Sequence, residues 1–194
     1  MSEIKDIKIM TLGNASVGKT SFVLRYTNEI FSENYLSTLG VDFKQKEIKL
    51  KNGQNIRLRI FDTAGQERFK TTSSDFIKKT DGIILIYDIS NYDSFKATNG
   101  WMEGIKENGK EDLPIILVGN KCDLSDDNRQ VSLKEGEDKA NEFQIPFFET
   151  SCKDGINVNE VIEKLVEDII ERGNRNIDKE VKILNKKNEK KKCC

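Results

Sequence analysis

Few folds accommodate the way in which short apolar runs alternate with helical segments along this chain. Gly82–Asp88 and Pro114–Gly119 are continuous apolar runs, which is typical of strands buried on both faces. Ile4–Leu12 and the shorter Ile145–Glu149 are predicted strands as well. Strands that alternate with helices predict a mostly parallel sheet covered by helices on both faces. Helices are expected at Gly18–Asn28, Glu67–Lys79, Ser94–Asn108 and Leu133–Glu142.

One pair of segments departs from this alternation. Val41–Leu50 and Asn55–Phe61 alternate between apolar and polar residues on either side of Asn52-Gly53, which is a strong signal for a hairpin turn. The hairpin adds one antiparallel strand to the sheet. The sequence therefore predicts a single α/β domain with a six-stranded, mostly parallel sheet.

The last predicted helix carries its apolar residues at helical spacing from Val158 to Ile170, and we assign this stripe to core packing. After Gly173 the periodic pattern ends and Asn, Lys and Glu dominate. We therefore expect a folded domain over residues 1–173 and a flexible basic tail over residues 174–194. The tail has eight Lys or Arg residues and three Asp or Glu residues in a chain whose net charge is −1, so the rest of the chain is acidic.

This charge distribution and the composition exclude several classes of protein. An acidic body argues against nucleic-acid binding, whereas the basic tail suits a negatively charged surface. The chain contains no histidine, which excludes histidine catalysis and histidine-ligated metal. Its four cysteines lack the spacing of a zinc site, and its apolar runs are too short to span a bilayer. The N-terminal residues lack a signal peptide, so a cytoplasmic protein is the default expectation.

The first motif with a chemical meaning is Gly13–Thr20, which fits the phosphate-binding pattern G-x-x-x-x-G-K-[ST] between a predicted strand and a predicted helix. Its glycines allow backbone N–H groups to converge on phosphate oxygens at a helix N-terminus. Lys19 is expected to reach the β- and γ-phosphates, and the Thr20 hydroxyl to bind Mg²⁺. The residues expected to bind the phosphates are Asn14, Ala15, Ser16, Val17, Gly18, Lys19, Thr20 and Ser21.

The second motif is Asp62, which follows the apolar strand that closes the hairpin. An aspartate after a strand is usually a turn former. About forty residues after a phosphate-binding loop, however, it is expected to provide a carboxylate for the Mg²⁺ shell.

The third motif, Asn120-Lys121-Cys122-Asp123, follows the predicted strand Pro114–Gly119, at the edge where open α/β sheets bind ligands. Guanine presents N1–H and a 2-amino group side by side, and the Asp123 carboxylate can accept from both. Adenine would leave that carboxylate opposite a lone pair, which gives strong rejection. The motif therefore favours GTP and GDP over adenine nucleotides, and opposes an ATPase or a nucleotide kinase.

With these motifs in place, the chain resembles the Rab family of small GTPases within the Ras superfamily. The resemblance extends over essentially the whole chain, and the segments that carry it are S-T-L-G-V-D-F at 37–43, D-T-A-G-Q-E-R-F at 62–69, L-I-Y-D-I-S at 85–90 and the terminal Cys193-Cys194. A Ras-type chain would end in C-a-a-X, and a Rho-type chain would carry a helical insert. The resemblance implies a P-loop GTPase domain that switches between GDP and GTP states in vesicle trafficking.

The resemblance also implies roles for residues that local sequence would not single out. Phe31 should pack against the guanine ring, and Thr38 should bind Mg²⁺ and sense the γ-phosphate. Gly65 should donate its N–H to the γ-phosphate, and Gln66 should orient the attacking water while Lys19 stabilises charge. The segment Thr150-Ser151-Cys152-Lys153 matches the family's last guanine motif, in which the Cys152 N–H faces O6 and Ser151 and Lys153 flank it.

The tail and the surface complete these expectations. Cys193 and Cys194 resemble a doubly geranylgeranylated terminus, which would anchor the protein on the cytoplasmic side of an intracellular or plasma membrane, with a cytosolic pool. Phe43, Phe61 and Phe76 should form the aromatic surface for effectors, although Phe61 replaces the usual Trp. The expected partners are effectors, an exchange factor, a GTPase-activating protein, a prenylation escort and a dissociation inhibitor.

Two alternatives remain open at this stage. A Ras- or Rho-type signalling GTPase with an unusual terminus would share the nucleotide chemistry and differ in its partners. A membrane-tethered scaffold that binds GTP with little hydrolysis would share the binding motifs alone. Gln66 and Thr38 argue against the scaffold, because both residues serve hydrolysis and the sensing of the γ-phosphate.

Overall fold

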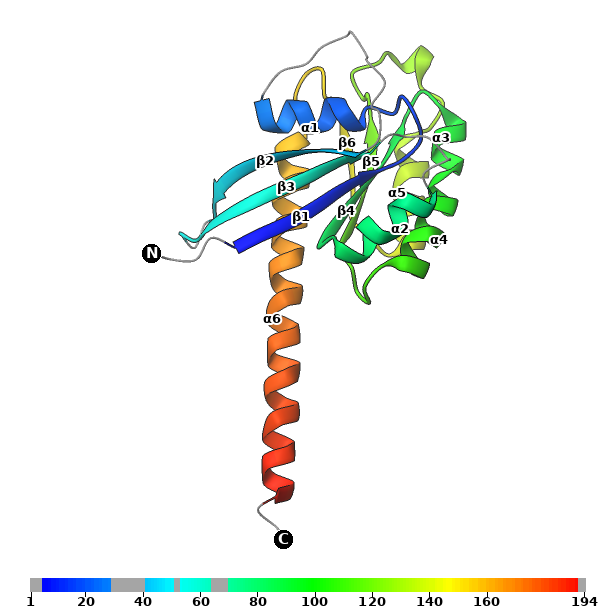
Figure 1. The fold of residues 1–194 in the computed structure, drawn as a ribbon. Helices are drawn as coiled ribbons and strands as arrows, with labels where there is room; N and C mark the ends of the chain where they lie inside the picture. The colour runs from blue at the N-terminus through cyan, green and yellow to red at the C-terminus, as the bar shows by residue number, and fades with distance from the viewer. Residues whose placement is uncertain (1–4, 29–40, 51–52, 64–69, 192–194) are drawn as a thin grey trace.

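A computed structural model of the chain describes residues 5–28, 41–50, 53–63 and 70–191, with the side chains of 28, 41, 63, 70–74 and 176–191 left out. Strands and helices alternate as the sequence predicts (Figure 1). In chain order the elements are β1 (Lys5–Leu12), α1 (Lys19–Asn28), β2 (Val41–Lys49), β3 (Asn55–Thr63), α2 (Lys70–Lys79), β4 (Gly82–Asp88), α3 (Tyr92–Lys96), α4 (Thr98–Asn108), β5 (Ile115–Asn120), a short 3-10 helix η2 (Asp126–Asn128), α5 (Leu133–Phe143), β6 (Phe147–Thr150) and α6 (Val158–Lys191).

The sheet has six strands in the order β2-β3-β1-β4-β5-β6, in which β2 is antiparallel to β3 and the other pairs are parallel. The predicted fold class is therefore confirmed. All seven residues of β4 are buried, as expected of a continuous apolar run in the middle of a sheet. At the turn between β2 and β3, Gly53 has a φ of 85° and donates its N–H to the Leu50 carbonyl, which closes the hairpin.

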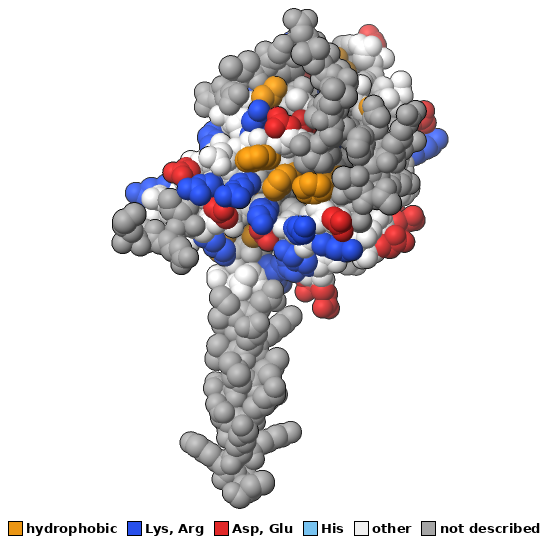
Figure 2. All heavy atoms as spheres, in the orientation of Figure 1, with side chains coloured by type: hydrophobic (Ala, Val, Ile, Leu, Met, Phe, Trp, Pro, Cys, Tyr) orange, Lys and Arg blue, Asp and Glu red, His pale blue; other side chains and the backbone are white. Residues whose placement is uncertain are grey.

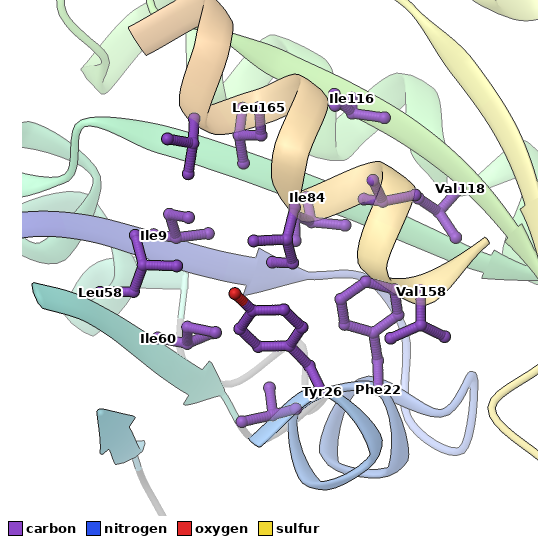
Figure 3. Packing of buried hydrophobic residues seen from close by; sticks show 14 of the residues in the cluster. Ile9, Phe22, Tyr26, Leu58, Ile60, Ile84, Ile116, Val118, Val158 and Leu165 are labelled. Atoms are coloured by element: carbon purple, nitrogen blue, oxygen red, sulfur yellow. The ribbon is translucent and has the colours of Figure 1, made fainter. Parts of the chain in front are cut away.

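Helices cover both faces of the sheet. The first face packs against α1 and α6, where Phe22, Tyr26, Val158 and Leu165 meet isoleucines such as Ile84 from the strands (Figure 3). The second face packs against α2, α3, α4 and α5. Each strand of the parallel region therefore buries side chains on both sides, which holds the carboxyl ends of the strands in fixed positions along one edge.

Two helical segments differ from their prediction in detail. The segment predicted as one helix over Ser94–Asn108 is divided at Ala97 into α3 and α4. Asn91 caps α3 by accepting a hydrogen bond from the Ser94 N–H, so that α3 begins two residues before Ser94. The capping box predicted at Ser132 and Glu135 is confirmed at the start of α5.

The region after Gly173 differs more strongly, because α6 continues as a helix to Lys191, where the sequence predicts irregular structure. Residues 174–191 contain neither Gly nor Pro and are rich in Lys, which has high helix propensity. This part of α6 extends away from the rest of the protein (Figure 1). Among the described residues, none of the helices, α6 included, is long and apolar enough to cross a bilayer.

Candidate nucleotide-binding site

The loop between β1 and α1 turns sharply at two glycines. Gly13 has a φ of 141° and Gly18 a φ of 100°, values that L side chains rarely adopt. A Cβ atom at Gly13 would lie 2.1 Å from the Ile86 carbonyl oxygen, and one at Gly18 would lie 2.2 Å from Asn120 Nδ2. Both positions therefore require glycine, and the loop packs directly on β4 and β5.

Lys19, the first residue of α1, is buried against this loop. Its Nζ donates to the Gly13 carbonyl at 3.0 Å and to the Asn14 carbonyl at 2.7 Å. Burial lowers the pKa of Lys19 to about 8, and the nearby Asp62 carboxylate partly opposes that shift. An incompletely solvated ammonium at the mouth of this loop is suited to receive an anion, which would replace the lost hydration.

Thr20 and Asp62 bring two hard oxygen donors together at the end of β3. The Thr20 hydroxyl donates to Asp62 Oδ2 at 2.6 Å, and Asp62 is only 4% exposed. A hydroxyl and a carboxylate at the end of a phosphate-binding loop form the donor set that Mg²⁺ prefers. These residues therefore fit a Mg²⁺ ion shared with a nucleotide.

Asn120, at the end of β5, connects the phosphate-binding loop to β6 and to the segment that follows β6. Its Nδ2 donates to the Val17 carbonyl at 2.9 Å, and its Oδ1 accepts from the Thr150 hydroxyl at 3.0 Å and the Cys152 thiol at 3.3 Å. Asn120 is paired with Asp88 on β4 and Thr150 on β6, so the carboxyl ends of three parallel strands meet here. This is the edge where open α/β sheets bind ligands.

Asp123 lies next to the loop that follows β6. The Ser151 hydroxyl donates to Asp123 Oδ1 at 2.7 Å, and the Ser151 oxygen accepts from the N–H of Asp154 at 3.0 Å. Ser151 and Cys152 are buried, whereas Lys153 is exposed. The structure therefore brings the two predicted base-reading motifs into direct contact, although about thirty residues separate them in the sequence.

Two predicted positions, Asn14 and Lys121, are held by residues to which the sequence analysis gave no role in the site. Trp101 on α4 donates from Nε1 to Asn14 Oδ1 at 2.9 Å, which fixes the phosphate-binding loop from the side. Asp88 at the end of β4 forms an ion pair with Lys121 at 2.5 Å. The backbone of Lys121 has a φ of 71°, and the ion pair helps to hold it there. A single Trp on a helix and an Asp after a strand carry no local signal for these roles.

The remaining predicted residues divide into two groups. Ala15, Ser16, Val17 and Ser21 lie in the loop and the first turn of α1, and Ser16 has a φ of 63°, which bends the loop backbone. The other group lies outside the described residues and comprises Phe31, Thr38, Gly65, Gln66, Cys193 and Cys194.

Three aromatic rings form a continuous strip across β2, β3 and α2. Phe43 on β2 and Phe61 on β3 have ring centroids 6.1 Å apart, and Phe61 lies 6.0 Å from Phe76 on α2. Phe43 is 53% exposed. Figure 2 shows hydrophobic side chains gathered on this face, with Lys, Arg, Asp and Glu side chains next to them. An exposed apolar group of this kind is typical of a protein-binding surface.

Cys152 provides a test of how tightly this edge is packed. Burial raises the pKa of its thiol to about 12, and burial also raises the pKa of the less buried Cys122. Because the thiolate is the species that alkylates, we expect iodoacetamide at pH 8 to modify Cys152 at least about 100-fold more slowly in native protein than in urea. Peptide mapping by mass spectrometry measures both rates, with Cys122 as the faster internal control. Equal rates in native and unfolded protein would contradict the burial of Cys152.

The fold and this edge define a P-loop nucleotide-binding domain. A loop that turns at two glycines leads into a helix, and a lysine is buried against the loop. A threonine hydroxyl pairs with the Asp62 carboxylate at the end of β3, and Asn120 at the end of β5 donates to the loop.

Comparison with known proteins narrows this class. The Ras family model matches residues 8–171. Ras-related protein Rab-3 of Caenorhabditis elegans is 43% identical over 173 residues, which cover 89% of this chain and 78% of that protein. Ras-related protein Rab-3A of Homo sapiens is 44% identical over 171 residues, covering 88% and 77%, and GTP-binding protein yptV2 of Volvox carteri is 40% identical over 166 residues, covering 86% and 76%.

The chain therefore belongs to the Ras family and, within it, to the Rab small GTPases. It is a GTPase that binds GTP, GDP and Mg²⁺, and it acts in vesicle trafficking.

Proposed function

We propose that this Rab GTPase is a membrane-anchored switch that recruits effectors in its GTP state and releases them after hydrolysis. The observation that carries the proposal is the convergence of Lys19, the Thr20–Asp62 pair and the Asn120–Asp123 pair on one edge of the sheet. A single guanine nucleotide with its Mg²⁺ ion can then contact all three groups at once.

In this proposal Asp123 reads the guanine base by accepting from N1–H and the 2-amino group. The Ser151 hydroxyl supports this role, because its bond to Oδ1 limits rotation of the carboxylate. The Ser151 carbonyl accepts from the N–H groups of Gly155 and Ile156 at 2.8 Å and 3.0 Å. In a trans peptide the next N–H points the opposite way, so the Cys152 N–H faces away from that turn and toward guanine O6. Lys121 and Lys153 flank the base.

The phosphates are held by the backbone N–H groups of residues 14–21 and by the Lys19 ammonium. Mg²⁺ would be held by the Thr20 hydroxyl, the Asp62 carboxylate and the Thr38 hydroxyl. When bound, the ion neutralises charge that develops on the phosphate oxygens during hydrolysis. Lys19 contributes to the same stabilisation from within the loop, where burial makes its charge more effective.

The switch itself depends on residues outside the described part of the chain. Thr38 and Gly65 contact the γ-phosphate through backbone N–H groups, Phe31 covers the guanine ring, and Gln66 orients the water for in-line attack. Loss of the γ-phosphate removes the contacts of Thr38 and Gly65, which releases the two segments that carry them. Hydrolysis is slow until a GTPase-activating protein supplies further charge stabilisation.

Effector recruitment and anchoring use two further parts of the chain. The strip of Phe43, Phe61 and Phe76 offers an exposed apolar contact surface for effectors. Lipidated Cys193 and Cys194 attach the protein to the cytoplasmic face of a membrane, because two chains anchor stably where one does not. Lysines next to the cysteines add attraction to anionic lipid.

The nucleotide that copurifies with the protein tests the proposal directly. The full chain is purified in Mg²⁺ and denatured, and the released nucleotide is identified by chromatography. We expect stoichiometric GDP or GTP. Adenine nucleotide would overturn the roles of Asn120 and Asp123, and an empty protein that also fails to bind GDP on titration would overturn the proposed site.

Gln66→Leu tests the hydrolytic step separately from binding. The leucine side chain cannot orient water, so we expect single-turnover GTP hydrolysis to slow by at least about tenfold, with GTP affinity unchanged. The measurement is phosphate release from preloaded protein, with Gln54→Leu as a matched control in the β2–β3 hairpin region. An unchanged hydrolysis rate would remove Gln66 from the mechanism.

A further inference from the structure

Arg25 lies on α1, the helix that begins with Lys19 and Thr20, and its side chain reaches the loop after β6. Its Nε donates to the Cys152 carbonyl at 2.5 Å, and its Nη2 donates to the Lys153 carbonyl. Arg25 and these residues are separated by more than 120 positions in the sequence. The guanidinium therefore links the helix of the phosphate-binding loop to the loop proposed to face the base.

The two bonds act on the carbonyls that follow the Cys152 N–H in the chain. Ser151 is held from the preceding side, by its hydroxyl bond to Asp123 and by its carbonyl bonds to Gly155 and Ile156. Arg25 holds the two carbonyls that follow. The peptide that contains the Cys152 N–H therefore lies between two fixed segments, and its direction is set from both sides.

An apolar contact accompanies this polar link. Phe22, one turn before Arg25 on α1, packs next to Val158 at the start of α6, where the loop ends (Figure 3). α1 thus borders the loop through a ring contact and a guanidinium. Because one planar guanidinium can place two donors with little loss of conformational freedom, arginine is better suited to this link than lysine.

We propose that Arg25 is a positioning residue for nucleotide retention, which holds the Cys152 N–H in the direction that guanine O6 requires. The inference rests on the proposed function, because it takes the contact between Cys152 and O6 as given. It adds a coupling between the two halves of the site: α1 carries the phosphate contacts at its N-terminus and the support for the base contact near its C-terminus.

The experiment compares GDP release from the wild-type chain, Arg25→Gln and Arg25→Lys. Rapid filtration and chromatography of the retained nucleotide measure each release rate. Arg25→Gln loses the hydrogen bonds of the charged guanidinium to the two carbonyls, which should weaken the contact between the Cys152 N–H and guanine O6. We therefore expect this variant to release GDP about tenfold faster. Arg25→Lys keeps the charge and one donor, so an intermediate rate of about threefold is expected. Unchanged release from both variants would overturn the proposal.

Two further readouts separate positioning from a general loss of stability. Release in EDTA should accelerate by the same factor as in Mg²⁺, because Arg25 acts on the base side of the site. Release of 6-thio-GDP, whose sulfur is a weak acceptor, should accelerate much less than release of GDP. Equal acceleration for the two nucleotides would assign Arg25 a merely structural role.

Arg172→Gln is the matched control, because Arg172 on α6 also donates to a loop carbonyl, that of Glu111 at 2.6 Å, far from the nucleotide site. Its GDP release should equal that of the wild type, and faster release would show that any lost arginine–carbonyl bond has this effect. A wild-type protein that retains no guanine nucleotide would instead overturn the proposed function, before Arg25 is considered.

Discussion

Asp123→Asn should lower the affinity for GDP by at least about 1,000-fold, because a site built to pair hydrogen bonds strongly rejects a mismatched partner. The Ser151 hydroxyl, which donates to Asp123 Oδ1 at 2.7 Å, can still donate to the oxygen of an asparagine. The amide nitrogen would then face the 2-amino group of guanine, so that two donors oppose each other. Isothermal titration of nucleotide-free protein with GDP measures the loss.

The same substitution should change which base is preferred. Xanthine carries an oxygen at C2 in place of the amino group, and this oxygen can accept from the asparagine amide. We therefore expect the variant to bind xanthosine diphosphate more tightly than GDP, which reverses the order of the wild type. Asp126→Asn makes the same chemical change in the exposed helix η2 and should alter neither affinity. A variant that keeps GDP affinity within about tenfold would exclude Asp123 as the base-reading group.

Lys19→Met should lower GDP affinity by about 100-fold or more, because it removes one member of a buried, hydrogen-bonded charge pair with the phosphates. Methionine keeps much of the length of the side chain and fills the space against the loop. The lysine ammonium is incompletely solvated in the nucleotide-free protein, and its pKa is lowered to about 8 by burial. Methionine removes the desolvated charge but also removes the donor to the Gly13 and Asn14 carbonyls, so the melting temperature of that form should change little. GDP titration and thermal unfolding of the same samples measure both effects.

Lys46→Met is the control for a half-buried lysine outside the site. Lys46 on β2 donates from Nζ to the Tyr26 carbonyl at 2.7 Å and lies over the Tyr26 ring, so it makes bonds of the same kind as Lys19. GDP affinity should be unchanged in this variant. A similar loss of affinity in both variants would mean that general packing around α1, rather than the Lys19 charge, limits binding.

Much of the fold follows from local patterns in the sequence. The continuous apolar run Gly82–Asp88 is fully buried as β4, and the capping box at Ser132 and Glu135 starts α5. The spacing of residue types in Gly13–Thr20 and in Asn120–Asp123 carries the chemistry of the candidate site. These features are readable because a periodic pattern or a glycine at a tight turn depends on neighbours a few residues away.

The tertiary structure decided which distant residues support that site. Trp101, Asp88 and Arg25 look like ordinary helix or strand-end residues, yet each reaches a residue of the candidate site. Their partners depend on the order β3-β1-β4-β5-β6, which aligns strand ends from across the chain. The sequence alone thus predicted the sheet type and most of the elements, but neither the division of one helix at Ala97 nor the helix that continues beyond Gly173. The long-range contacts could not be predicted, because a hydrogen bond between residues 127 positions apart produces no pattern in the sequence of either segment. Only the arrangement of the strands side by side defines these contacts.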